Sequence, residues 1–577
     1  MNNKIRKRLL IGLSFIICHL SFSMMFTSCA KLIDTDSEII EFEEDNKLQS
    51  PTDSVYSVMG IIYKMQGVAD RTVLLGELRS DLTITTDAAS ADLKAITNFQ
   101  IDSKNAYNRI SDYYAIINNC NYFLTHINKD LEKSGRMVFE GEYVAVKAYR
   151  AWTYLQLAQI YGKVPLITTP LLTEEAAQKA MTENICDITA ICNYFIDDLN
   201  GKLGTKDYAD TDLPNYGLEN SQKYFIPIRA LLGDLCLWAG RYQEAAQFYH
   251  DYLAMRTNPI RTWTDKASWG NLDSREFNWW ISSISYEIKS DECLCAIPME
   301  SNKFYGIKSE LRDIFNSTDD NMYFAQVTPT KRLYELSADN NYCYTYRKVN
   351  GSLDTLYAPK ENLEKSEWIG DLRFGTTYTY SIENQGRFAH ISDKRQTIRK
   401  IQSNSVTLYR TNMVYLRYAE ALNRAGYPQS AFAVLKYGLY PDVVNKYIDE
   451  AERNAAGSLI SFDIDLFTAD NTQGIHSRGS GNADCDTLFV LPQPQEQLAT
   501  RQDTVNYQIP LVEDMIINEM ALEGAFEGYR FNDLMRVALR RNDPAYLADP
   551  VSRRNGESDD ALRQKLMDPK NWYLPLQ

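Results

Sequence analysis

The apolar positions of this chain recur mainly at helical spacing. The strongest stretch covers residues 143–168, where Trp152, Leu155 and several alanines fall on one face of a helix. Tyrosines and leucines flank this face, so the helix must be covered on several sides. Gly162 ends it, and Pro165 prevents early resumption. The pattern therefore predicts a buried central helix.

Further amphipathic helices are predicted over residues 51–78, 105–127 and 183–200. Residues 517–536, which a motif resemblance assigns to a helix, carry alternating charges at three-residue steps. They mark either a binding site or an internal ion-pair ladder that holds the helix to its neighbours, and we favour the ladder because helical ion pairs are common. The residues are Glu527, Arg530, Asp533 and Arg536.

Two stretches have the spacing of tetratricopeptide helix pairs. Within residues 230–252, Gly233 would let two helices approach closely and Gly240 would make the turn between them. Residues 414–439 match less well, because Pro428 takes an aromatic position of the repeat. Helix pairs this far apart indicate a repeat scaffold interrupted by a large insertion.

The predicted insertion covers residues 261–405, which have little helical periodicity. Within it, residues 292–298 and 375–382 are predicted as short strands, and the rest as loops. Residues 456–490 have a similar composition, and their glycines predict a mobile loop that acts as a linker. These glycines are Gly474, Gly479 and Gly481.

The amino terminus predicts export. Residues 1–28 combine a basic start with an apolar stretch. This stretch is short and contains polar residues, whereas a transmembrane helix needs ~20 predominantly apolar residues. Small residues before Cys29 resemble a bacterial lipoprotein signal, in which Cys29 carries the lipid; a weak transmembrane anchor is the alternative. Residues 29–50 form an acidic tether, similar to the signal that directs Bacteroidetes lipoproteins to the cell surface.

Charge and motifs restrict the function. The net charge of −15 argues against a nucleic-acid partner, which requires a surface rich in Lys and Arg. The mature chain has no H-E-x-x-H, G-x-S-x-G or P-loop motif, so we predict a non-enzyme without catalytic residues. The five histidines are scattered and are predicted to be surface or helix residues. A surface glycosidase remains an alternative, because its two carboxylates have no motif of their own.

Cysteine spacing predicts neither a metal site nor a cofactor. The eight cysteines other than Cys18 and Cys29 include no C-x-x-C and no Cys/His cluster with zinc spacing. Five of the eight lie in apolar sequence and are predicted to be buried as small hydrophobic side chains.

An aromatic cluster in the insertion is the functional candidate. A sugar ring has an apolar face that fits a flat indole and hydroxyls that fit a polar rim. The alternative is that these side chains pack the loops onto the helical body, which is the usual fate of a single Trp. For the whole cluster we expect at least one exposed ring. The candidate ligand-binding residues are Trp263, Trp269, Trp279, Trp280 and Tyr286, with Asp273, Arg275 and Asn278 as the rim.

Four separated motifs resemble the SusD/RagB family, which comprises lipid-anchored nutrient-binding proteins on the surface of Bacteroidetes. They are R-A-W-T-Y-L-Q-L-A-Q-I-Y-G-K-V-P-L-I (Arg150–Ile167), L-R-Y-A-E-A (Leu416–Ala421), the segment Ile517–Arg536, and W-Y-L-P-L (Trp572–Leu576). They occur in the order of the family. Within the third motif, Met520 and Gly524 depart from the usual Arg and Leu.

The resemblance implies a mainly α, SusD-like body in which tetratricopeptide-like helix pairs carry a loop-rich insertion. It divides into an N-terminal helical region (51–260) and a C-terminal region (261–577) that contains the insertion. The family's ligand face corresponds to the loop 79–104 and the insertion. The implied function is capture of a glycan at the outer membrane, facing the exterior, and delivery to a SusC-type TonB-dependent transporter. Peptide capture, as in the RagB branch, is the alternative.

Overall fold

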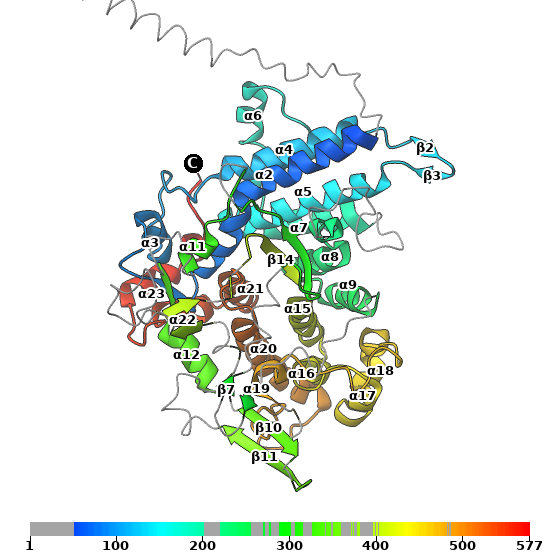
Figure 1. The fold of residues 1–577 in the computed structure, drawn as a ribbon, viewed down its shortest axis with the longest axis vertical. Coiled ribbons are helices and arrows are strands. Elements are labelled where there is room, and N and C mark those ends of the chain that lie inside the picture. Colours follow the sequence, from blue (N-terminus) through cyan, green and yellow to red (C-terminus); the bar gives the residue numbers. More distant parts are fainter. Residues whose placement is uncertain are drawn as a thin grey trace, which may run out of the picture. The chain divides into compact units, whose positions relative to one another are not determined.

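Helices make up most of the described chain, and its strands occur in antiparallel pairs (Figure 1). This computed structural model therefore confirms the predicted mainly α fold with a few short strands. The described residues all belong to one unit, Gln49–Gln577. They are residues 51–200, 220–255, 269–271, 276–277, 288–301, 306–315, 326–340, 342–347, 350–358, 371, 373, 378–380, 396–398, 400–401, 403–481, 483 and 486–576.

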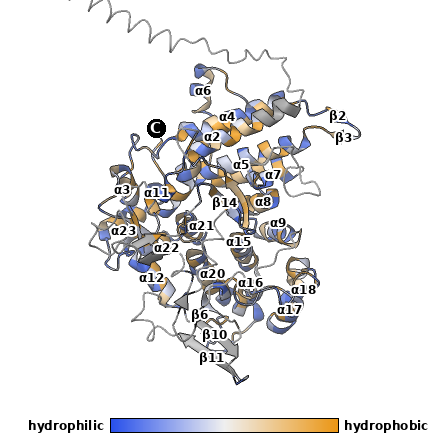
Figure 2. Cartoon of the chain, viewed as in Figure 1, coloured by the Kyte–Doolittle hydropathy of each residue, from blue (hydrophilic) through white to orange (hydrophobic). Residues whose placement is uncertain are grey.

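The predicted central helix is α5 (Glu140–Tyr161), and 18 of its 22 residues are buried. It ends at Gly162, whose φ of +77° suits a residue without a side chain. Figure 2 shows hydrophobic residues gathered where α5 lies beside its neighbours. Helices α2 (Pro51–Glu77), α4 (Ile110–His126), α7 (Ile188–Asn200) and α8 (Ile228–Ala239) cover it. The prediction of a helix buried on several sides is confirmed.

The first predicted helix pair consists of α8 and α9 (Tyr242–Met255). Gly240 makes the turn in a left-handed conformation, with φ +79°. A Cβ on Gly233 would overlap the ring of Tyr249, so this glycine allows the close approach that the sequence predicts. The second pair is α15 (Thr411–Arg424) and α16 (Pro428–Lys436). Because α15 also packs against α9, the two pairs form one scaffold despite the sequence between them.

The helix predicted over residues 517–536 is wrong in one respect, because two helices occupy this segment. Helix α20 (Arg501–Glu523) is separated from α21 (Arg530–Arg541) by a turn in which Phe526 and Gly528 have positive φ values of +69° and +88°. The backbone N–H groups of both residues donate to the carboxylate of Glu77 in α2, each at 3.0 Å. The turn thus wraps around a buried side chain, which helical periodicity alone does not reveal.

Two paired strands enclose the larger part of the predicted insertion, residues 298–405. β8 (Cys293–Ile297) confirms the strand predicted at 292–298, and it pairs with β14 (Val406–Arg410). Strand β12 (Tyr378–Tyr380) lies within the strand predicted at 375–382 and confirms it, and it pairs with β13 (Gln396–Ile398). The other pairs are β1 (Thr83–Thr85) with β9 (Val327–Pro329), β2 (Glu132–Lys133) with β3 (Arg136–Met137), β4 (Val164–Pro165) with β5 (Ile185–Cys186), β6 (Trp269–Asn271) with β7 (Glu276–Phe277), and β10 (Tyr342–Arg347) with β11 (Leu353–Ala358).

Shorter helices complete the described structure. They are α3 (Ala91–Thr97), α6 (Glu174–Ala180), α11 (Leu311–Phe315), α12 (Lys331–Ala338), α17 (Pro441–Tyr447), α18 (Glu450–Ala456), α19 (Ser477–Ser480), α22 (Ala545–Ser552) and α23 (Asp560–Leu566), with 3₁₀ turns at Ser221–Tyr224, Gly457–Ile460 and Pro569–Trp572. Among the described residues, no helix combines the length and apolar character needed to cross a bilayer. Among the described residues, five cysteines are buried, as predicted for five of the eight, and all five are free: Cys120, Cys192, Cys236, Cys293 and Cys295.

Candidate functional site

Most of the predicted ligand-binding residues lie outside the described residues, as does Cys29. Only Trp269 belongs to a described element, strand β6. Their role in binding therefore stays a prediction. The residues outside the described ranges are Trp263, Asp273, Arg275, Asn278, Trp279, Trp280 and Tyr286.

The other predicted wall, the loop 79–104, begins inside the protein. The Nη1 group of Arg79 donates to the backbone oxygen of Trp572 at 2.7 Å, and both side chains are buried. Asp81 is 0% exposed and forms two hydrogen bonds with Arg530, at 2.7 and 2.8 Å. The first four residues of this segment thus join α2 to the C-terminal helices. Exposed positions begin further on, around α3.

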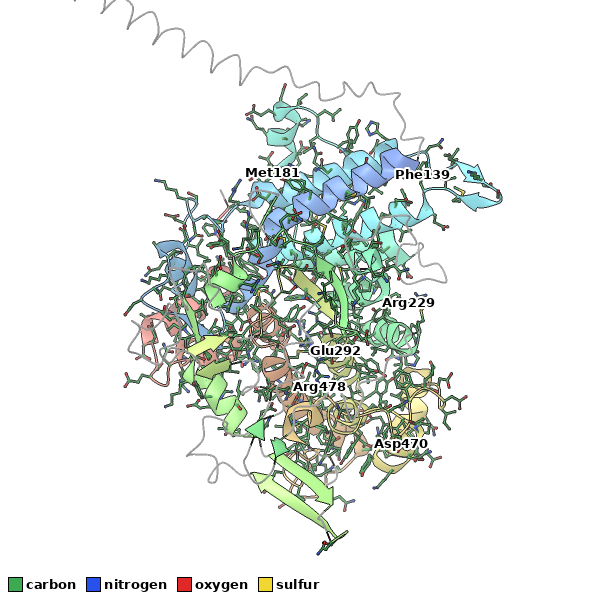
Figure 3. All side chains as sticks on the ribbon, in the orientation of Figure 1. Phe139, Met181, Arg229, Glu292, Asp470 and Arg478 are labelled. Atoms are coloured by element: carbon green, nitrogen blue, oxygen red, sulfur yellow. The ribbon has the colours of Figure 1, made fainter. Side chains whose placement is uncertain are left out.

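A buried charge cluster lies where the insertion meets the body. Arg410, at the end of β14, forms two hydrogen bonds with Glu527, at 2.8 and 2.6 Å. Its Nη1 group also donates to Glu292, just before β8, at 3.1 Å. Glu292 accepts from Arg478 as well, at 2.7 Å, and the two side chains lie close together in Figure 3. Glu292, within the insertion, and Arg410, just after it, are therefore tied to one another and to the C-terminal turn.

At Glu523, the last residue of α20, the effect of nearby cations on the pKa exceeds the effect of burial. Burial alone would raise the pKa of this carboxyl, but the nearby guanidinium groups of Arg478, Arg410 and Arg373 hold its pKa well below the ordinary value. Arg373 forms hydrogen bonds with Glu523 at 3.0 Å and with Asp371 at 2.7 Å. The cluster is thus a network of ionised, mutually paired groups.

The charges of the third motif serve the interior, as we predicted. Besides the Glu527–Arg410 pair, Arg530 pairs with Asp81, and Arg536 pairs with Glu420 of α15 at 2.9 Å. Only Asp533 and Arg536 pair within the same helix. The ladder therefore holds α21 to α15 and to the segment after α2.

The Gly-rich segment is not a linker, and that prediction is wrong. Residues 477–480 form the buried helix α19. A Cβ on Gly479 would overlap the carboxylate of Asp371, and a Cβ on Gly474 would overlap the backbone at Lys436. Glycine is required at both positions, because charged or backbone groups pack directly against the Cα atom and leave no room for a side chain.

His476, which the sequence predicted to be a surface or helix residue, is 3% exposed. Its ring nitrogens contact Glu519 at 2.8 Å and Asp486 at 3.2 Å. Burial lowers the pKa of this imidazole, but the two carboxylates outweigh burial and raise its pKa to about 9. His476 is therefore a cation of the buried network at neutral pH.

A pocket opens on the helical body, lined by side chains from α2, α5, α8, α15, α21 and β14. Its enclosed volume is about 50 Å³, which is far below the roughly 300–1,000 Å³ that is usual for ligand pockets. We call it the body pocket. Its lining includes two indoles, three carboxamides and three carboxyl groups: Trp152, Trp238, Gln156, Gln159, Asn532, Asp234, Glu527 and Asp533.

One side of the body pocket has polar atoms without partners. The carboxamides of Gln156 and Asn532 both donate to the Gln159 oxygen, at 3.4 Å. The oxygen Oδ1 of Asn532 and the oxygen Oδ2 of Asp533 are buried and accept no hydrogen bond in the described part of the chain. Asp533 accepts from Arg536 through its other oxygen, at 2.9 Å. Burial raises the pKa of Asp533, and Arg536 offsets this rise only in part.

The opposite side of the body pocket is internally satisfied. Asp234 accepts from Tyr249 at 2.5 Å, from Tyr409 at 2.8 Å and from Arg417 at 2.8 Å. The guanidinium carbon of Arg417 also lies 4.9 Å from the ring centre of Tyr529. This side is a rigid wall rather than a set of free ligand groups. Sequence analysis missed the pocket because its lining comes from segments far apart along the chain.

The sequence and the fold were compared with those of known proteins. No protein-family model and no curated protein matches the sequence. Solved structures do match: a SusD-like carbohydrate-binding protein from Bacteroides fragilis NCTC 9343 is 16% identical, with a TM-score of 0.53 over 85% of this chain and 87% of that chain. The chain has the SusD-like fold. A SusD superfamily protein from Bacteroides vulgatus ATCC 8482 and a SusD homolog from Bacteroides thetaiotaomicron VPI-5482 are each 14% identical, with TM-scores of 0.54. The first covers 90% of this chain and 92% of that chain; the second covers 92% and 95%.

The SusD-like fold confirms the family resemblance that the four motifs indicated, at the level of architecture. In the described part of this fold, no group of three His, Cys, Asp or Glu side chains is placed to hold a metal ion. The body pocket lies on the helical scaffold, whereas the predicted ligand face consists of loops. The two candidate sites are therefore distinct in sequence.

Proposed function

We propose that this protein captures an oligosaccharide or polysaccharide at the cell surface and leaves its covalent bonds unchanged. The observation that carries this proposal is the fold shared with the Bacteroides fragilis protein, which is described as SusD-like and carbohydrate binding. The absence of catalytic sequence motifs in the mature chain agrees with it.

The proposed binding surface is the aromatic cluster of the insertion. The rings of Trp279, Trp280 and their aromatic neighbours stack on sugar faces, and Asp273, Arg275 and Asn278 contact the hydroxyls. The cluster around Arg410 supports this assignment, because it ties Glu292, which follows the aromatic cluster in sequence, to Arg410 and so to the body. Long loops can then present side chains without loosening the scaffold.

The proposed location is the outer membrane, facing the exterior, with the lipid on Cys29 as anchor and residues 29–50 as tether. A SusC-type TonB-dependent transporter is the proposed receiver of the glycan. The SusD-like fold and the lipoprotein-type signal support this partnership.

Affinity electrophoresis tests the capture proposal. Protein with Cys29→Ala is run through gels that contain single polysaccharides, and peptide binding is measured in parallel. We expect retardation by at least one glycan and a loss of retardation in the double variant Trp279→Ala/Trp280→Ala. The matched control is Tyr63→Ala, which removes an exposed ring on α2 (53% exposed). Peptide binding without glycan retardation would replace glycan by peptide, and sugar release from a retarding polysaccharide would establish a glycosidase.

A further inference from the structure

We propose that Glu77, the last residue of α2, is a proton-linked latch that sets how firmly the end of the insertion is held to the helical body. The latch acts on the turn between α20 and α21, residues 523–528, which we call the junction turn. This device is independent of the proposed capture of a glycan.

Glu77 holds the junction turn from the side of α2. The backbone N–H groups of Phe526 and Gly528 donate to its two carboxylate oxygens, each at 3.0 Å. Phe526 has a φ of +69°, which a residue other than glycine seldom adopts without support from its surroundings. The turn also touches α2 directly, since a Cβ on Gly76 would lie 1.7 Å from the carbonyl oxygen of Gly528. Glu77 is therefore sealed from water, with 0% of its surface exposed.

Lys400 holds the same turn from the side of the insertion. Its Nζ group donates to the backbone oxygens of Glu523 at 2.7 Å and Ala525 at 3.0 Å, and it forms an ion pair with Glu527 at 2.5 Å. The backbone donors of the turn thus bind α2, and its backbone acceptors bind the insertion. Movement of the turn away from α2 therefore changes the support of Lys400.

The charges around Glu77 leave it short of a cation. Lys400 is paired with Glu527, and Arg530 is paired with Asp81, so neither cation is committed to Glu77. None of the ion pairs between described residues includes Glu77. Because burial penalises an unpaired carboxylate, the closed turn favours a protonated Glu77. Other cations near this end of α2 bond to backbone oxygens, to Asp81 or to Glu527: Arg79, Arg332, Arg410 and Arg554.

The direction of the pH dependence follows from burial. Desolvation raises the pKa of Glu77 from 4.5 to about 7, and the two N–H bonds and the charge of Lys400 offset this rise only in part. Opening of the turn returns the carboxyl to water and to its ordinary pKa. The closed turn is therefore most stable below about pH 4.5, and this stabilisation is lost as pH rises through 7. With these two pKa values, the equilibrium constant for opening rises about 70-fold between pH 5 and 8.

Hydrogen exchange of the Cys29→Ala protein measures this opening, in peptides that span the junction turn and with rates corrected for the intrinsic effect of pH. We expect protection to fall about 70-fold between pH 5 and 8, and Glu77→Gln to remove this dependence. Asp70 on the same helix has its pKa raised by burial to about 6, so only the difference from Glu77→Gln is assigned to Glu77. The matched control is Glu557→Gln, which removes an exposed carboxyl. Protection that is independent of pH, or an equal fall in Glu77→Gln, would overturn the proposal.

A second variant tests the connection to the insertion. The charge of Lys400 lowers the pKa of Glu77, so Lys400→Met should move the midpoint of the exchange profile to higher pH. Lys163→Met, which removes an exposed cation, is the control and should leave the midpoint unchanged. In the protein that retains both side chains, peptides that contain Lys400 should lose protection over the same pH range as the junction turn. If the turn responds to pH while these peptides do not, Glu77 does not act on the insertion and the latch is refuted.

Discussion

Arg410 offers the sharpest test of the buried charge cluster. It is 0% exposed, and its guanidinium forms two hydrogen bonds with Glu527 and one with Glu292. Arg410→Met keeps a long side chain but leaves these carboxylates with fewer cations in a desolvated site. Removing one partner of a buried ion pair typically costs about 3–5 kcal/mol. We therefore expect the free energy of unfolding to fall by about 4 kcal/mol.

The assay is thermal and urea unfolding of the Arg410→Met protein, compared with a control variant that breaks an exposed ion pair. Unfolding entropy is about 2.1 cal/mol/K per residue, so a loss of about 4 kcal/mol over the unit Gln49–Gln577 lowers Tm by about 4 °C. The control is Arg501→Met, which breaks a pair with Asp449 whose two side chains are 42% and 43% exposed. Such a pair contributes about 0–1 kcal/mol.

The comparison also carries its own internal check. Adding Glu527→Gln to Arg410→Met should recover part of the lost stability, because it removes a fully buried charge that has lost Arg410 and keeps Lys400 as its remaining cation. If Arg410→Met destabilises no more than Arg501→Met, the cluster does not hold the insertion to the body. The inference that Glu292 and Arg410 hold the insertion to the body would then be refuted.

Three further predictions concern pH, packing and the anchor. The pKa of His476 is raised to about 9, above its ordinary 6.5, so its stabilisation is complete below about pH 6.5 and is lost as pH rises through 9. His476→Gln should therefore remove up to about 3 kcal/mol of the decline in stability between pH 7 and 10, measured by urea midpoints; an unchanged slope would contradict it. Gly233→Val should destabilise by about 1–3 kcal/mol, because its side chain would overlap the ring of Tyr249, and an unchanged Tm would show that the helices can separate. Cys29→Ala should abolish labelling by radioactive palmitate and membrane association in cell fractionation, and persistence of both would disprove the anchor.

Local signals were sufficient for the helical scaffold. The apolar circumference around Trp152 predicted burial, and Gly162 predicted the end of α5. Gly233 predicted a close approach of two helices, because a residue without a side chain leaves room for an aromatic ring of the facing helix. These inferences worked because Trp152 and Gly162 act within one helix, and Gly233 and Tyr249 lie within one pair of consecutive helices.

Features set by distant partners were not predictable in the same way. The break between α20 and α21 depends on Glu77, which binds backbone groups of Phe526 and Gly528 from far away in the sequence. The departure at Gly524 was a signal, since Gly524 caps the end of α20. Gly479 looked like a linker because Asp371, the group packed against it, lies in another segment.

The body pocket illustrates the same limit for function. Asp533 was correctly interpreted as part of an ion-pair ladder, yet only one of its two oxygens serves that ladder. A sequence pattern identifies the partner at helical spacing but not the second oxygen, whose surroundings come from other helices. Since Arg536 holds one oxygen in place, the other is fixed in direction as well. A structural ion pair thereby fixes the direction of a buried acceptor that has no partner within the described residues.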